Sequence, residues 1–301
     1  MSADPTSSAS SLSSSLRAVL LEMRPRQWTK NLILLAPLLF SLELSRLVDV
    51  LRAAAAVALF CLVCGAVYIL NDLHDLRRDR LHEVRRRRPL AAGELDPRVA
   101  AVAVGVLLAV SLGGGLLLSP WFALVTLGYV ALQAAYTFFL KNEVILDVMA
   151  ISAGFVLRVT AGAEAIHVVV SPWLLSCAAL LALFLAFVKR RHELLADTHA
   201  LEHRPVLRKY TPALLDQAIA IVTSSTFVVY AIYTFLSQSA TDRPYLMLTI
   251  PFVGYGLLRY LYLMHARHLG GSPEEILLSD VPLAIDLGLW TLVVVIVLYL
   301  T

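Results

Sequence analysis

The chain consists mainly of long apolar runs that are separated by short polar connections. Several runs approach or exceed the roughly 18 to 20 residues that a helix needs to cross a bilayer. They are continuous rather than alternating, which favours helices over a closed barrel, the other fold that satisfies all backbone polar groups in lipid. The pattern predicts an all-α polytopic membrane protein with nine spans. The predicted spans are 32–50, 53–71, 99–118, 121–140, 145–166, 172–189, 213–236, 244–264 and 281–300.

The composition excludes an ordinary soluble domain. Of the 301 residues, 59% are hydrophobic and only 16% are charged, whereas roughly a quarter of the residues in a soluble domain are charged. Residues 1–16 are rich in Ser and Ala and contain no apolar run, so we expect a disordered tail there. Residues 17–301 are then expected to form a single transmembrane domain.

Basic residues collect on one side of the predicted topology. The N-terminal segment and the connections after the second, fourth, sixth and eighth spans carry nearly all of the Lys and Arg side chains, whereas the other side carries only Arg46, Arg52 and Arg243. Because short basic loops remain in the cytoplasm, we expect the N-terminus inside and, with nine spans, the C-terminus outside. We expect a membrane bilayer and no nucleic acid as a partner.

An acidic motif follows the second predicted span. On a helix, Asp72, Asp75 and Asp79 share one face and lie within about 60° of one another, directly after Asn71. Three like charges on one face repel unless a cation binds there, and Mg²⁺ prefers carboxylate and phosphate oxygens. The alternative is a solvated helix end whose acids pair with nearby arginines. These arginines are Arg77, Arg78 and Arg80.

A dense basic run, residues 85–88, comes directly after the acidic motif. Arginine forks bind phosphate oxygens, so acids and arginines side by side fit a metal–diphosphate complex, and we place Arg86 and Arg88 among the substrate-binding candidates. The alternative is a topology signal alone, since basic loops fix orientation in many membrane proteins.

A second charged constellation ends the sixth predicted span. Lys189, Arg190 and Glu193 lie there together with Asp197. Glu193 and Asp197 are four residues apart and share a helical face, which predicts a second metal- or phosphate-binding edge. The alternative is ordinary pairing of residues four apart on an exposed helix end.

A few ionisable groups lie inside or at the end of apolar runs. Asp147 and Arg158 are eleven residues apart, close to three helical turns, and so share one face of the fifth predicted span. Charged groups in such positions usually face a bundle interior or a water-filled cavity. Arg158 and Arg259 are therefore candidates for binding an anionic substrate, or for structural ion pairs with neighbouring helices. Tyr136 and Lys141, around the end of the fourth predicted span, are further candidates.

The basic stretch 24–31 before the first predicted span contains Trp28. One interpretation is an interfacial anchor, with the indole at headgroup depth and the cations on lipid phosphates. The other is that Arg26, Lys30 and Asn31 reach the functional site.

Together these motifs resemble the UbiA-type intramembrane prenyltransferase superfamily, whose first acidic motif is NDxxDxxxD. The likeness runs through nearly the whole chain, and the segment RPRQWTKN is its most specific part. The matching segments are 24–31, 71–79, 88–93, 152–162, 189–193 and 273–280. The resemblance implies a nine-helix bundle around a central cavity that opens to the cytoplasm and to lipid. The chain departs from the aromatic prenyltransferases of the superfamily, because only Glu193 and Asp197 occupy the region of their second Asp-rich motif.

Within the superfamily, the motifs are most similar to the decaprenyl-phosphate phosphoribosyltransferases. That resemblance implies transfer of 5-phosphoribose from 5-phosphoribosyl diphosphate (PRPP) to a polyprenyl phosphate, with Mg²⁺, or Mn²⁺ in its place. It implies a multi-pass protein of the bacterial cytoplasmic membrane with the active site facing the cytoplasm, and a homo-oligomer is also considered. The expected catalytic and metal-binding residues are Asp72, Asp75 and Asp79. The expected substrate-binding residues are Arg26, Lys30, Asn31, Asn71, Arg86, Arg88, Tyr136, Lys141, Arg158, Lys189, Arg190, Glu193 and Arg259.

Two other functions stay open at this point. The first is a UbiA-type aromatic or quinone prenyltransferase that uses a polyprenyl diphosphate, since it shares the fold and the first acidic motif. The second is a lipid-phosphate transporter without enzymatic activity, which would need access from both faces of the membrane.

Overall fold

The computed structural model describes residues 15–300 except 82, 197–204, 238–243, 268–269, 272–275 and 277–278, and every regular element among them is helical. The long helices are α3 (Leu47–Asp79), α5 (Pro97–Leu118), α6 (Pro120–Phe138), α7 (Leu146–Ile166), α8 (Pro172–Ala196), α10 (Pro212–Leu236), α12 (Ile250–Ala266) and α14 (Val281–Tyr299). The short ones are η1 (Pro25–Leu35), α2 (Ala36–Phe40), η2 (Glu43–Ser45), η3 (Arg85–Arg87), α4 (Pro89–Ala92), η4 (Leu140–Asn142), η5 (Pro205–Lys209) and η6 (Pro244–Thr249).

Several of the long helices begin with the same local signal. A Ser, Thr or Asp side chain accepts a hydrogen bond from a backbone N–H of the first turn, and proline, which has no N–H to satisfy, comes directly after it. The pairs are Asp96–Pro97, Ser119–Pro120, Ser171–Pro172 and Thr211–Pro212. This signal therefore fixes where these four helices begin.

Eight helical segments in the described part of the chain are long and apolar enough to cross a membrane. They correspond to the second to ninth predicted spans, so these eight predictions are confirmed. The first predicted span, 32–50, is wrong in its bounds, because α3 already begins at Leu47 and the residues before it form η1, α2 and η2.

The 3₁₀ geometry of η1 explains the difference. A 3₁₀ helix rises about 2.0 Å per residue, so the 11 residues of η1 extend about 22 Å. The five residues of α2 add about 7.5 Å at the α-helical rise of 1.5 Å. Pro25–Phe40 is thus about 30 Å long, which matches the hydrocarbon core of a bilayer. A ninth membrane crossing stays a prediction, and we now expect it at Pro25–Phe40 rather than at residues 32–50.

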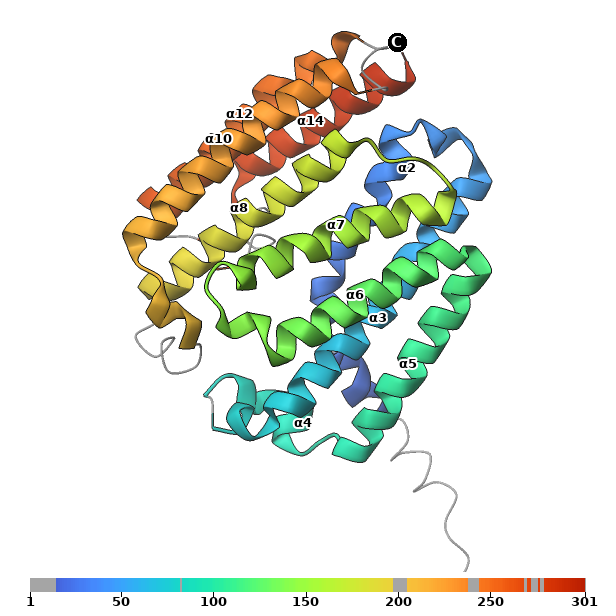
Figure 1. Cartoon of the computed structure of the whole chain (residues 1–301), viewed down its shortest axis with the longest axis vertical. Coiled ribbons are helices and arrows are strands. Elements are labelled where there is room, and N and C mark those ends of the chain that lie inside the picture. The colour runs from blue at the N-terminus through green and yellow to red at the C-terminus, as the bar shows by residue number, and fades with distance from the viewer. Residues whose placement is uncertain are drawn as a thin grey trace, which may run out of the picture.

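The helices form two groups that meet at α7 and α8 (Figure 1). The first group contains η1, α3, α5, α6 and α7, and the second contains α8, α10, α12 and α14. One apolar core of the first group includes Leu34, Phe60 and Phe122, whereas Phe184 and Leu263 belong to a core of the second. The central cavity stays an expectation from the family resemblance.

Helix α3 carries the acidic motif beyond the apolar layer. Its 33 residues make a rod about 50 Å long at 1.5 Å per residue, about 20 Å longer than the hydrocarbon core of a bilayer. The last two turns, which hold Asp72, Asp75 and Asp79, therefore lie at the membrane boundary.

Replacing Gly162 with alanine is expected to destabilise the fold, because η1 packs directly against this glycine of α7. A Cβ atom at Gly162 would collide with the backbone carbonyl of Leu34, and overpacking of this kind typically costs about 1 to 3 kcal/mol. The thermal unfolding midpoint in detergent would measure the effect. Gly128→Ala in α6 is the matched control, since its Cβ meets no atom within 4 Å, so it should be neutral or stabilising. Equal midpoints for the two variants would contradict the close approach of η1 and α7.

Candidate active site

The N-terminal segment docks onto α3 beside the acidic motif. Gly65 leaves room for Met23, because a Cβ atom there would lie 2.7 Å from the Met23 side chain. The next residue, Arg24, has φ 53° and ψ 66°, in the left-handed region that side chains other than glycine rarely adopt. This turn places the flanking side chains of Glu22 and Arg24 around Asp72.

Two arginines from different segments neutralise the two buried acids. Arg24 Nη2 lies 2.5 Å from each carboxylate oxygen of Asp72. Arg88 Nη1 bridges Asp72 and Asp79, at 3.0 Å and 2.6 Å, and Arg85 lies 3.6 Å from Asp79. Because Asp72 and Asp79 are only 2% and 1% exposed, both carboxylates depend on these cations.

The acidic motif and the cations that pair with it form a rim at this end of the bundle. Asp75 lies in a more open part of this rim. Its carboxylate accepts hydrogen bonds from Lys141 Nζ at 3.1 Å and 3.2 Å. The sequence-based alternative, in which Arg77, Arg78 and Arg80 pair with the acids, is wrong. These three side chains are exposed, and no ion pair in the described part of the chain includes them, whereas the acids pair with Arg24, Arg85, Arg88 and Lys141.

The chemistry of the donor set fits a hard divalent cation, although the acids are not gathered around one point. Among the described residues, no three His, Cys, Asp or Glu side chains are placed to hold a metal ion, because Arg88 lies between two of the acids. Asp79 Oδ1 is buried and has no hydrogen-bond partner among the described residues, and the buried Glu22 carboxyl group lies against Asp72. Buried carboxylate oxygens without donors are costly, and a Mg²⁺ ion would satisfy them. Asp72, Asp79 and Glu22 are the residues that would hold it.

Glu22 is a candidate site residue that the sequence-based predictions missed. The side chain is 2% exposed, and burial raises the pKa of its carboxyl to about 7, with a further increase from the hydrogen bond to Asp72. Two carboxyl groups can share a hydrogen bond only if one of them carries a proton. The available signal was a single acid in an otherwise basic N-terminal segment between Arg17 and Arg26.

Replacing Glu22 with glutamine is expected to remove a pH-dependent loss of stability in the metal-free protein. Its folded-state pKa of about 7 exceeds the ordinary 4.5, so the stabilisation is complete below pH of about 4.5 and is lost as the pH rises through 7. The whole effect is on the order of 3 kcal/mol. Unfolding midpoints in detergent with EDTA, from pH 5 to 8.5, would reveal it.

The exposed Glu83→Gln variant serves as the control and should retain the wild-type pH dependence. The Glu22→Gln protein should be the more stable of the two at pH 8. An unchanged slope in Glu22→Gln would contradict the raised pKa.

The second predicted edge is a buried ion-pair cluster at the same end of the bundle. Arg190 Nε donates to Asp147 at 2.6 Å, and its Nη1 donates to Glu193 at 2.8 Å. Tyr210 Oη donates to Asp147 at 2.7 Å, and Arg190 Nη2 lies 3.4 Å from Tyr136 Oη. Helix α6 and η4 therefore connect the two edges, with Tyr136 at Arg190 and Lys141 at Asp75. Asp197 lies outside the described residues.

Arg158 and Asn31 lie together in a different place, deeper in the first group of helices. Arg158 donates to Asn31 Oδ1 at 3.0 Å, to Tyr129 Oη at 2.7 Å and to the Gly154 carbonyl at 3.1 Å. Cys64, also in this network, precedes Asp72 by two turns or about 12 Å along α3. The network joins η1, α3, α6 and α7 through polar contacts, and the substrate-binding roles of Arg158 and Asn31 stay predictions.

Of the remaining predicted residues, Arg259 lies away from the acidic motif. Arg259 forms a two-pronged ion pair with Asp280, which caps the first turn of α14. Arg26 and Arg86 are exposed and take part in no ion pair among the described residues, whereas Lys30 donates to Gln27 at 2.5 Å. Asn71 and Lys189 are part-buried neighbours of Asp72 and Arg190.

Comparison with known proteins gives a consistent result. The model of the UbiA prenyltransferase family matches residues 32–273. A decaprenyl-phosphate phosphoribosyltransferase of Corynebacterium glutamicum is 35% identical over 286 residues, 92% of this chain and 86% of that protein. The protein of the same name from Mycolicibacterium smegmatis is 34% identical and covers 89% of this chain and 88% of its own length. A solved UbiA homologue from Archaeoglobus fulgidus, bound to DMAPP and Mg²⁺, has the same fold, with a TM-score of 0.71, 20% identity and coverage of 94% and 99%.

Proposed function

Because the chain belongs to the UbiA prenyltransferase family, we propose that it transfers 5-phosphoribose from PRPP to a polyprenyl phosphate and releases pyrophosphate. The observation that carries this proposal is the 33–35% identity, over most of the chain, to proteins named decaprenyl-phosphate phosphoribosyltransferase. The cation-rich rim supports it, since the two substrates together bring a sugar phosphate, a diphosphate and a lipid phosphate to one place.

The reaction needs little from a general base. The lipid phosphate is already an anion at neutral pH, and one of its oxygens forms a bond to C1 of the ribose. The bond from C1 to the pyrophosphate oxygen breaks, and pyrophosphate leaves with the electron pair. The main demand on the protein is therefore to hold three phosphate groups in position and to stabilise the charge on the leaving group.

We assign the binding of the phosphate groups and the stabilisation of the leaving group to the residues of the rim. Asp72, Asp79 and Glu22 would hold Mg²⁺, which would supply charge stabilisation for the departing pyrophosphate. Arg24 and Arg88 exchange their carboxylate partners for phosphate oxygens, which their forked guanidinium groups match. Lys141 and Arg190 extend the positive rim toward α8, where a further phosphate group would lie.

The same rim supports the proposed orientation. It carries most of the basic side chains that flank the membrane spans, and basic loops remain cytoplasmic. We therefore place the rim and the N-terminus on the cytoplasmic side of a bacterial inner membrane. Mn²⁺ in place of Mg²⁺, a homo-oligomer and a single catalytic unit over residues 17–301 are part of the same proposal.

Product identification by mass spectrometry tests the function. Membranes that contain the full chain would be incubated with labelled PRPP, a polyprenyl phosphate and Mg²⁺, and we expect polyprenyl-phosphoryl-5-phosphoribose. Omitting the lipid phosphate should abolish the product. Prenylation of an aromatic acid from a polyprenyl diphosphate, or lipid translocation without any dependence on PRPP, would overturn the proposal in favour of the other two functions.

A further inference from the structure

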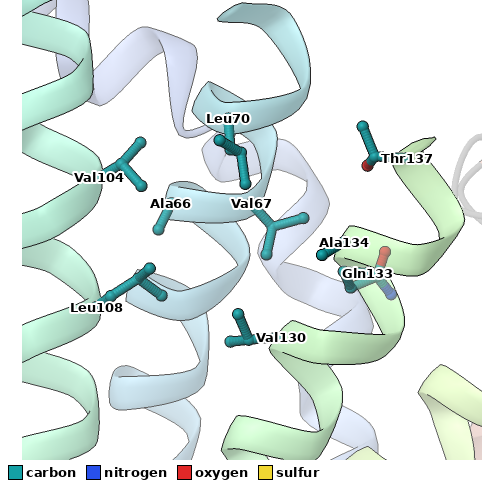
Figure 2. Close-up of a pocket in the computed structure, with 9 residues that line it drawn as sticks. All are labelled: Ala66, Val67, Leu70, Val104, Leu108, Val130, Gln133, Ala134 and Thr137. Atoms are coloured by element: carbon teal, nitrogen blue, oxygen red, sulfur yellow. The ribbon is translucent and has the colours of Figure 1, made fainter. Parts of the chain in front are cut away.

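A second binding feature lies on the outside of the first helix group. The helices α3, α5 and α6 enclose a groove whose floor is formed by Ala66, Val67 and Leu70 of α3 (Figure 2). Leu108 of α5 and Ala134 of α6 form the walls of this shallow groove. Val67, Leu70 and Ala134 are only part-buried, so the groove is accessible from outside the bundle.

This groove and the acidic motif lie on opposite faces of α3. His74 follows Leu70 by four residues and Arg77 follows it by seven, so these three side chains share one face. At about 100° per residue, Asp72 and Asp79 point roughly 120° to 140° away from Val67. A phosphate bound at the acidic motif therefore cannot place its chain in this groove without passing around α3.

One to two turns beyond Leu70, His74, Arg77 and Arg78 form a basic patch at the same end of α3. His74 packs edge-on against Phe138 of α6, with 4.9 Å between ring centroids. Arg77 and Arg78 are exposed, and neither takes part in an ion pair among the residues that the structure describes. Two guanidinium groups without a carboxylate partner thus stand at the mouth of an apolar groove.

Exposed apolar side chains near this patch indicate its position relative to the lipid headgroups. Leu81, one turn beyond Arg77, is 88% exposed, and Phe139 at the end of α6 is 72% exposed. Large apolar and aromatic side chains in such positions anchor a protein at the headgroup layer. Arg77 and Arg78 therefore lie at the level where the phosphates of the surrounding lipids lie.

We propose that the groove and its basic patch bind one phospholipid of the bilayer that has an anionic headgroup. Its phosphate accepts hydrogen bonds from Arg77 and Arg78, and one acyl chain fills the groove between α5 and α6. Charge complementarity selects the occupant, because a zwitterionic lipid brings its own cation to the patch, whereas an anionic lipid brings a net negative charge that both arginines attract. Basic pockets between membrane helices bind anionic lipids in this way.

Lipid titration of the purified full chain in detergent, followed by native mass spectrometry, tests the proposal. We expect phosphatidylglycerol to bind at least tenfold more tightly than phosphatidylcholine of the same acyl chains. The double variant R77Q/R78Q should bind phosphatidylglycerol about 30-fold more weakly, since each basic residue at the surface contributes about a fivefold change in affinity. The variant Arg208→Gln, which changes an exposed arginine of η5 in a different part of the molecule, is the control and should bind like the wild type.

A second variant tests the apolar half of the site. Ala134→Leu narrows the groove without changing charge and should weaken phosphatidylglycerol binding severalfold, with an unfolding midpoint near that of the wild type. Inorganic phosphate at millimolar concentration should not displace the lipid. Equal binding of the two lipids, wild-type affinity in R77Q/R78Q, or wild-type affinity in a folded Ala134→Leu protein would each overturn the proposal.

Discussion

Replacing Asp72 with alanine is expected to lower phosphoribosyl transfer by a factor on the order of a thousand while the protein stays folded in detergent. Asp72 is buried at the centre of the rim, where it faces Arg24, Arg88 and Glu22. Its loss removes a carboxylate that would hold the metal, leaves Arg24 without its carboxylate partner and leaves Arg88 with Asp79. The measurement is the initial rate of product formation from labelled PRPP over a range of Mg²⁺ concentrations.

Two further variants separate chemistry from folding. Asp72→Asn retains the shape of the side chain and should lose activity to a similar extent with a smaller loss of stability. Asp49→Asn is the matched control, because Asp49 is a buried acid at the opposite end of the same helix, 3% exposed and paired with Arg46. It should retain most of the activity. A rate in Asp72→Ala that still rises with Mg²⁺ to near the wild-type value would rule out the metal assignment.

Replacing Asp147 with alanine is expected to destabilise the protein by about 3 to 5 kcal/mol, the typical cost of leaving a buried charge unpaired. Asp147 and Arg190 are 0% and 1% exposed and lie 2.6 Å apart. Without Asp147, Arg190 retains only Glu193 as an acidic partner in this cluster. The unfolding midpoint in detergent would measure the loss. The control is Asp216→Ala, which removes the partially exposed partner of the adjacent Arg191 and should cost at most about 1 kcal/mol.

A double variant separates the two roles that Arg190 could have. Asp147→Leu combined with Arg190→Met replaces the ion pair by apolar groups, which is often nearly neutral for stability. We expect the double variant to regain most of the stability that Asp147→Ala loses. If Arg190 also binds a substrate phosphate, as proposed, the stable double variant should still transfer phosphoribose slowly and show a raised KM. Wild-type kinetics in this variant would limit Arg190 to a structural role.

The spans could be predicted because a helix that crosses lipid requires a long run of apolar residues in the sequence. Apolar runs of sufficient length correspond to the eight spanning segments, and the shared face of Asp72, Asp75 and Asp79 follows from helical spacing. The bounds of the first predicted span did not follow this rule. The 3₁₀ winding of η1 extends each residue further than an α-helix does, so Pro25–Phe40 reaches the length of a span with fewer residues than the rule requires.

The partners of the acids could not be predicted from nearby sequence. Arg77 and Arg78 are close to Asp75 and Asp79 along the chain, but the helical rotation turns them to the groove face. Arg85 and Arg88 follow Asp79 within nine residues, whereas the other partners come from distant segments. Arg24 and Glu22 reach Asp72 because Met23 packs into the space left by Gly65 and the backbone of Arg24 adopts a left-handed conformation. Contacts of this kind depend on tertiary docking, which spacing within one helix does not reveal.

The length of α3 also bears on where each reactant stays during the reaction. Since the helix extends past the apolar layer, the acidic motif lies at the interface between two solvents, water on one side and hydrocarbon on the other. In the proposed reaction the sugar donor approaches from water and the acceptor exposes only its phosphate, so neither has to be transferred into the other phase. Extracting a polyprenyl tail into water would cost about 0.8 kcal/mol for each CH₂ group, and a rim at this height avoids that cost entirely.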